Sequence, residues 1–104
     1  MALTLALELA ETFIRIKLRV LAMTHLYVRT QSNSLVIYSM ERNEEAIRGI
    51  LTHSSGNEFI LSIANHRGKW ELIPFVGELA KMMDLLTEDL TFALARWSES
   101  EIIV

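Results

Sequence analysis

The chain has no cysteine, one proline and four glycines among its 104 residues. Without thiols it cannot form a disulfide framework, a cysteine-ligated zinc site or a thiol nucleophile. No uncharged apolar run approaches the roughly 20 residues that a membrane-spanning helix needs. Linkers rich in proline, glycine or serine and internal repeats are also absent, so we expect a single domain over residues 1–104.

The N-terminal segment lacks the features of a secretory signal. No basic residue precedes its apolar stretch, and Glu8 and Glu11 interrupt that stretch. Together with the absence of cysteine, this favours a soluble, cytoplasmic protein with no membrane partner.

Hydrophobic residues make up 51% of the chain, which excludes a disordered polypeptide and predicts a folded core. Ten basic and thirteen acidic residues give a formal net charge of −3, which argues against a general affinity for nucleic acid. Residues 13–30 nevertheless contain no acid. Their four cations are Arg15, Lys17, Arg19 and Arg29. A local basic strip for an anionic partner is therefore retained as an alternative.

Periodicity predicts an amphipathic helix near the C-terminus, over about residues 77–97. Its apolar residues recur at steps of three and four, which places them on one face. They are Leu79, Met82, Met83, Leu86, Leu90, Ala93, Leu94 and Trp97. We expect Gly77 to be the N-cap and Glu78 to lie in the first turn, where the helix dipole favours an acid.

The middle of the chain predicts an antiparallel meander of about five strands. The segments are 25–30, 35–40, 46–53, 59–65 and 70–76. Turn residues separate several of them, and direct pairing in the first hairpin sets Tyr27 opposite Tyr38. A helix over 44–53 is the alternative for the third segment, and Gly49 argues against it.

Residues 3–21 have two interpretations. The alternation of Ile14, Ile16 and Leu18 with basic residues is typical of a strand, whereas the composition and the Glu11–Arg15 spacing favour a helix. We predict a helix. The expected fold is therefore α+β, with an N-terminal helix, a five-stranded antiparallel meander and a C-terminal helix packed on the sheet.

The last hairpin predicts apolar residues on both faces of the sheet. If Arg67 and Gly68 form its turn, then Ile63 lies opposite Leu72 and Leu61 opposite Pro74. One face would carry Phe59, Leu61, Ile63, Trp70 and Leu72. The other would carry Ile60, Ala64, Ile73 and Phe75, with Ser62 and Glu71 among them. A solvated face should instead alternate to polar residues.

The C-terminal helix can cover only one of these faces. Either the N-terminal segment or a second copy of the chain must cover the other. The N-terminal segment is itself apolar nearly all round. We therefore expect a homodimer, and a monomer with its helices on opposite faces is the alternative.

The densest group of chemically versatile residues is the hairpin tip, residues 66–70. Its candidate ligand or nucleic-acid contacts are His66, Arg67, Lys69 and Trp70. A histidine, two cations and a flanking indole could hold a phosphate or stack on an unpaired base. A solvated turn in which Trp70 fills the core explains the same residues.

No pattern indicates a catalytic, cofactor or metal site. His25, His53 and His66 follow no metal-binding spacing, and glycine-rich phosphate loops and nucleophile elbows are absent. In the expected register His53 lies opposite Glu58, which suggests a surface pair. We expect a small, self-associating, non-enzymatic interaction or regulatory domain that uses no cofactor. The alternatives are an accessory protein that binds nucleic acid or anions through the hairpin tip, and an enzyme whose active site forms between subunits.

Overall fold

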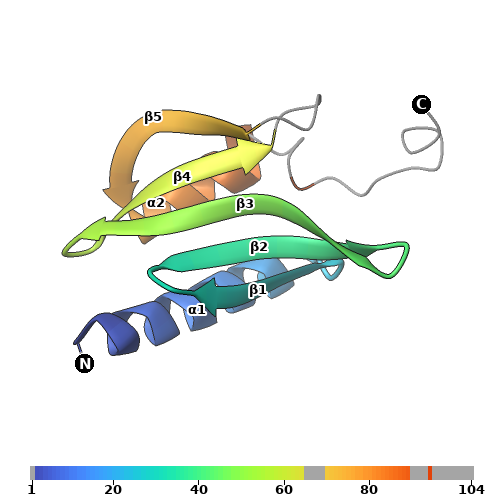
Figure 1. Cartoon of the computed structure of the whole chain (residues 1–104), viewed down its shortest axis with the longest axis horizontal. Coiled ribbons are helices and arrows are strands. Elements are labelled where there is room, and N and C mark those ends of the chain that lie inside the picture. The colour runs from blue at the N-terminus through green and yellow to red at the C-terminus, as the bar shows by residue number, and fades with distance from the viewer. Residues whose placement is uncertain (1, 65–69, 90–93, 95–104) are drawn as a thin grey trace.

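The computed structural model describes residues 2–64, 70–89 and 94 of the chain (Figure 1). A helix, α1 (Ala2–Val20), comes first. The strands are β1 (Leu26–Gln31), β2 (Ser34–Glu41), β3 (Glu44–Ser55), β4 (Glu58–Ala64) and β5 (Trp70–Glu78). A short helix, α2 (Leu79–Asp84), continues into a π-helical turn, η1 (Leu85–Asp89). The predicted α+β architecture is confirmed.

The ambiguous N-terminal segment is helical, as predicted. Its buried residues follow a helical period, and they are Leu7, Ala10, Ile14 and Leu18. The Arg15 guanidinium lies 3.5 Å from the Glu11 carboxylate, the i,i+4 pair expected from the spacing. No helix in the part of the chain that the structure describes is long and apolar enough to cross a membrane.

α1 ends without glycine. The Met23 amide donates to the Leu18 carbonyl at 2.9 Å, and the Ala22 amide donates to the Arg19 carbonyl at 3.0 Å. This is the Schellman arrangement, and it requires a left-handed residue, here Ala22 with φ 59°. Because glycine usually fills this position, the sequence shows no obvious stop signal there.

The sheet is a five-stranded antiparallel meander with the order β1-β2-β3-β4-β5. Tyr27 pairs with Tyr38 as predicted, and their rings stack with centroids 5.6 Å apart. Residues 44–53 lie within β3, so the helical alternative for this segment is wrong. The turn between β2 and β3 consists of Arg42 and Asn43, both with positive φ, as a two-residue type I′ hairpin requires.

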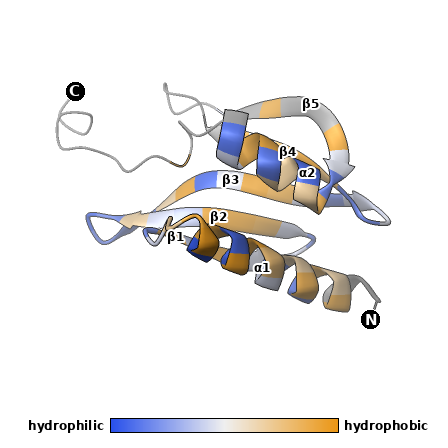
Figure 2. Ribbon diagram, turned by 180° about the vertical axis from the view of Figure 1, so that it is seen from behind, coloured by the Kyte–Doolittle hydropathy of each residue, from blue (hydrophilic) through white to orange (hydrophobic). Residues whose placement is uncertain are grey.

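Both helices lie on the same face of the sheet. They are behind the strands in Figure 1 and in front of them in Figure 2. One core cluster contains residues from both helices together with residues of the sheet, among them Ile14, Leu61 and Met83. The alternative with a helix on each face is therefore wrong. The other face of the sheet, here called the open face, has no helix of the described chain on it.

The register of the last hairpin differs from the prediction. Ala64 pairs with Trp70 and Ser62 with Leu72, whereas Ile60 pairs with Val76 across an irregularity. Pro74 lies in β5 within that irregularity, where a residue without an amide hydrogen interrupts the ladder.

A slip of one residue at the turn moves Trp70 and Leu72 to the opposite face, because side chains alternate along a strand. The predicted face is correct for Phe59, Leu61 and Ile63, which are buried. It is wrong for Trp70 and Leu72, which are 47% and 66% exposed.

The C-terminal helix begins later than predicted. Gly77 belongs to β5, and the N-cap is Glu78, whose side chain makes no capping hydrogen bond. Met82, Met83 and Leu86 are buried on the predicted apolar face, and Leu94 is buried as well. The predicted residues 90–93 and 95–97 lie outside the described part of the chain.

The register can be tested with Ile63 and Leu72, two side chains of similar size that the sequence predicted to lie on the same face. Ile63→Ala should lower the free energy of unfolding by about 2–5 kcal/mol, because it opens a cavity in the core. Leu72→Ala should lower it by less than about 1 kcal/mol, because Leu72 is 66% exposed. Urea unfolding at low protein concentration measures both. Equal losses would contradict the register.

The helix terminus generates a second test. Ala22→Gly should raise the free energy of unfolding by about 0.5–1 kcal/mol, since glycine adopts positive φ without a steric penalty. Ala6→Gly, inside α1, is the matched control and should lower stability by a similar amount. Thermal unfolding followed by circular dichroism measures both changes. A destabilised Ala22→Gly variant would mean that the helix does not end in this motif.

Candidate functional site

The open face is the side of the sheet that no helix of the described chain covers. The pairing gives its composition row by row. Across the middle of the sheet one row contains Arg29, Val36, Ile50, Ser62 and Leu72. On one side of it lie Tyr27, Tyr38 and Ile47, and on the other side Ser34, Thr52, Ile60 and Val76. Trp70 extends the face on β5.

Apolar side chains on this face are exposed to an unusual degree. Leu72, Val76 and Trp70 are 66%, 51% and 47% exposed, and Tyr27 and Met40 are each 51% exposed. A solvated antiparallel face normally carries polar residues at such positions. An apolar patch of this kind is typical of a surface that binds another macromolecule.

An ion pair lies at one corner of the open face. The Arg29 guanidinium lies over the Tyr38 ring, 5.7 Å from its centroid, and donates to both carboxylate oxygens of Glu45 at 2.7 and 3.2 Å. The hydrogen bonds from Arg29 are the main reason that the pKa of Glu45 is lowered from its usual value of 4.5. The same pairing raises the pKa of Arg29. This corner therefore carries fixed, mutually neutralised charge.

A hollow of about 440 Å³ lies where the end of α1 meets the edge strand β1. Arg15 and Arg19 from α1, and Tyr27 and Tyr38 from the sheet, contribute its polar groups. Its apolar lining consists of Leu18, Met23, Leu26 and Val28, with Thr24 beside them. The hollow combines two guanidinium groups with aromatic rings, a combination suited to an anion.

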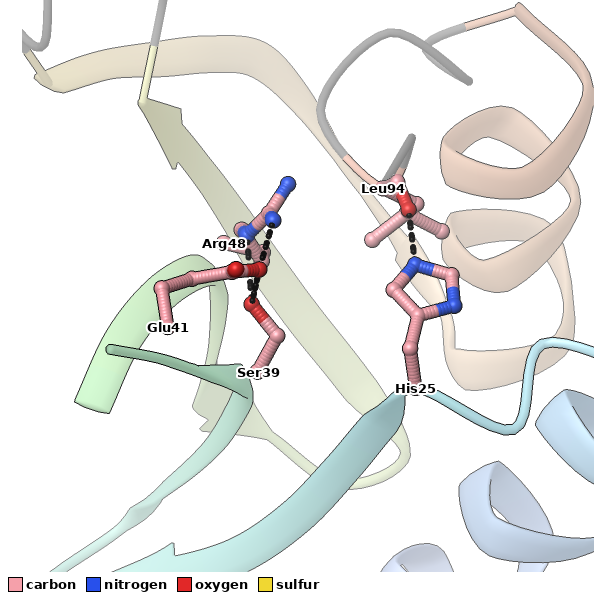
Figure 3. A network of polar contacts seen from close by, with 5 residues as sticks. All are labelled: His25, Ser39, Glu41, Arg48 and Leu94. Carbon is pink, nitrogen blue, oxygen red and sulfur yellow. Dashed lines mark hydrogen bonds and ion pairs between the residues drawn. The ribbon is translucent and has the colours of Figure 1, made fainter. Parts of the chain in front are cut away.

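A buried polar network lies on the helix-bearing face, near the turn between β2 and β3 (Figure 3). A bulge opposite Ile37 and Tyr38 makes Arg48 the extra residue of β3 and turns its side chain to this face. Arg48, only 3% exposed, donates through Nε to the Ser39 hydroxyl at 3.0 Å and through a terminal nitrogen to Glu41 at 3.0 Å. The Ser39 hydroxyl donates to Glu41 at 2.9 Å.

This network compensates its own buried charge. The Arg48 cation and the Glu41 carboxylate neutralise each other, and Ser39 accepts from one and donates to the other. A buried cation without such a partner would be strongly destabilising. We assign the network a structural role, which is to hold β2 against the bulged part of β3.

His25 links two segments that are far apart in the sequence (Figure 3). Its Nε2 lies 2.7 Å from the Leu94 carbonyl oxygen, which can only accept, so Nε2 carries the proton. Nδ1 is buried without a hydrogen-bond partner. The contact anchors the chain after α2 to the segment that precedes β1.

The predicted hairpin-tip residues are only partly described. His66, Arg67 and Lys69 lie outside the described residues. Trp70 is described, and its exposure excludes the interpretation in which it fills the core. It lies on the open face beside Leu72, so we assign it to that apolar surface.

The four cations of the predicted basic strip do not form one continuous surface, because three of them lie on the helix α1 and make separate contacts. The Lys17 ammonium lies 3.1 Å from the Asp84 carboxylate of α2, and Arg15 pairs with Glu11. Arg29 pairs with Glu45 on the open face. Arg19 lines the hollow, and it forms no ion pair with any residue that the structure describes.

The expected pairing of His53 with Glu58 is wrong. A second irregularity sets His53 opposite Phe59 and Ser55 opposite Glu58. The His53 ring instead donates through Nε2 to the Gly56 carbonyl at 2.7 Å and contacts Phe59 edge-on. Within residues 2–64, 70–89 and 94, no three His, Asp or Glu side chains lie close enough together to hold a metal ion.

Comparisons of this chain with models of protein families, with curated proteins and with solved structures give no match.

The Arg29–Glu45 pair generates a pH prediction. Because the folded-state pKa of Glu45 is lowered, its contribution to stability is complete above pH 4.5 and is lost as the pH falls through the folded-state pKa. Wild type should therefore be more stable than Glu45→Gln at pH 7, and this difference should vanish in acid. Chemical unfolding across this pH range measures it.

Glu44→Gln is the matched control for this experiment. Glu44 is exposed and forms no ion pair within the described residues. Its substitution should change stability little at any pH. A pH-independent difference between wild type and Glu45→Gln would show that the pair does not contribute as the geometry indicates.

Proposed function

We propose that this protein is a non-enzymatic interaction domain that self-associates, with the open face of one sheet packed on the open face of a second copy. The observation that carries the proposal is the placement of both helices on one face. The sequence left two candidates to cover the apolar face, the N-terminal segment and a second copy of the chain. The N-terminal helix lies on the other face, which favours the second copy.

The size of the open face supports this occupant. Five strands about 4.8 Å apart give a width of about 24 Å, and strands of 6–12 residues give a mean length of about 28 Å. The projected area is then roughly 670 Å², and side-chain relief adds to it. A stable interface buries about 800 Å² from each partner, so this face has a suitable size.

The chemistry of the face also suits a symmetric dimer. The face combines apolar residues, with Ile50 on the central strand β3 and Leu72 and Val76 on the edge strand β5, with the Arg29–Glu45 pair at one corner. Protein interfaces commonly combine apolar contacts with polar residues that stay close to solvent. Two twisted sheets packed face to face align at about −30°, and a two-fold axis between them would bring the same residues from both copies to the centre.

The nucleic-acid alternative receives less support from the described residues. Of the four cations in its basic strip, Arg15, Lys17 and Arg29 each pair with a carboxylate. These carboxylates would oppose the approach of phosphate groups. A cytoplasmic location forms part of our proposal, and the absence of cysteine from the chain supports it.

Measurement of mass against concentration tests the proposal. Wild type should exceed the monomer mass of 11.9 kDa at micromolar concentration in sedimentation or light scattering. Leu72→Lys should raise the dissociation constant of the sheet-to-sheet contact at least about 100-fold. A two-fold interface contains the residue twice, and each lost burial costs about 1.5 kcal/mol or more.

Leu21→Lys is the control for the added charge, because Leu21 is 41% exposed at the end of α1 and lies outside the open face. It should leave this contact unchanged. A monomer at all concentrations, or an association that Leu72→Lys does not weaken, would refute the proposal. Salt-sensitive binding of single-stranded oligonucleotides by such a monomer would support the nucleic-acid alternative instead.

A further inference from the structure

α1 carries a second apolar stripe, which the core does not use. Its residues are Leu5, Leu9, Phe13, Ile16 and Val20, and they are 57%, 63%, 40%, 53% and 74% exposed. At 3.6 residues per turn they occupy about 80° of the helix circumference. The centre of this outer stripe lies roughly 145° from the centre of the buried stripe, so it points away from the sheet.

The outer stripe is nearly symmetric along the helix. Leu5 and Val20, and likewise Leu9 and Ile16, are equally distant from a point between Thr12 and Phe13. In an antiparallel pair of α1 helices centred at this point, Leu5 therefore faces the second copy's position 20, and Leu9 faces its position 16. A self-complementary surface of this kind suits a two-fold contact.

The charges beside the outer stripe select the antiparallel direction. Glu8, Arg15 and Arg19 lie on the same side of it, with the acid near the start of the helix and the cations near the end. In the antiparallel pair, Glu8 lies between Arg15 and Arg19 of the second copy, each about 3 Å along the axis from direct opposition. In a parallel two-fold pair, this side of the stripe faces the other side of the second copy's stripe, so Glu8 does not meet these arginines.

From the exposed stripe, its symmetry and these charges, we infer that α1 pairs in antiparallel orientation with α1 of another copy, through the outer stripe. Arg19, which forms no ion pair among the described residues, then gains the Glu8 carboxylate of the second chain. This contact is independent of the open face, because the two surfaces lie on opposite sides of the molecule. A chain that uses both two-fold contacts is joined to two other copies, so assembly continues beyond the dimer.

A charge-exchange experiment tests the pairing on the full chain. Glu8→Arg sets a new guanidinium against Arg19 in both halves of the contact, and Arg19→Glu sets a new carboxylate against Glu8. Each variant alone should associate through α1 about tenfold more weakly than wild type. An equal mixture should recover wild-type association, because each chain then offers the charge that the other needs. Sedimentation of the separate variants and of their mixture measures this.

The expected result is growth beyond the dimer for wild type and for the mixture, whereas each variant alone should remain mainly dimeric at the same concentration and grow only at about tenfold higher concentration. If the open face forms no interface, wild type and the mixture should still be dimers and the single variants monomers, which supports the pairing while the proposed function fails. A mixture that behaves like the separate variants would overturn the inference. So would wild-type behaviour of both single variants.

Arg42→Glu is the matched control, since it makes the same charge change at the exposed turn between β2 and β3, outside both surfaces. It should leave association unchanged, and circular dichroism verifies that every variant remains folded. A lipid surface is the competing occupant of an apolar helix stripe. Binding of wild type to vesicles of phosphatidylcholine and phosphatidylserine, abolished by Leu9→Lys without any change in mass, would also overturn the inference.

Discussion

The placement of both helices on one face of a single sheet is the constraint on which the rest of this structure depends. One side of the sheet and one side of each helix share a core that is closed to water, with Ile14, Leu61 and Met83 fully buried. The opposite side of the sheet and the outer side of α1 remain apolar and exposed. Because apolar area is favourable only when it leaves water, both surfaces favour association.

The register of the last hairpin determines how apolar the open face is. With the simplest turn, Trp70 and Leu72 would have joined Ile63 in the core. The longer connection between Ala64 and Trp70, together with the irregularity that contains Pro74, moves them to the other side. One residue of slip thus converts two large core candidates into interface candidates, because alternation gives a strand no intermediate position.

Elements with a strong local signal could be predicted, and features set by long-range pairing could not. Periodicity and turn residues located the strands and α1 within one or two residues, and cross-strand pairing of Tyr27 with Tyr38 followed from a short hairpin. The Arg48 network could not be predicted, since it depends on a bulge between β2 and β3. The motif that ends α1 could not be predicted, because alanine occupies a position that glycine usually fills. The hollow and the exposed outer stripe of α1 could not be predicted either, because both depend on how the helix packs on the sheet.

Apolar surfaces alone would make this protein adhere to many others, so the charges beside them carry the specificity. On the open face, Arg29 and Glu45 form a fixed, neutralised corner that a partner must match or avoid. Beside the outer stripe of α1, the acid and the cations are separated along the helix, so the antiparallel pairing that we infer brings opposite charges together. In the two contacts that we propose, burial would supply the driving force, and the arrangement of a few exposed charges would limit the geometry in which burial can occur.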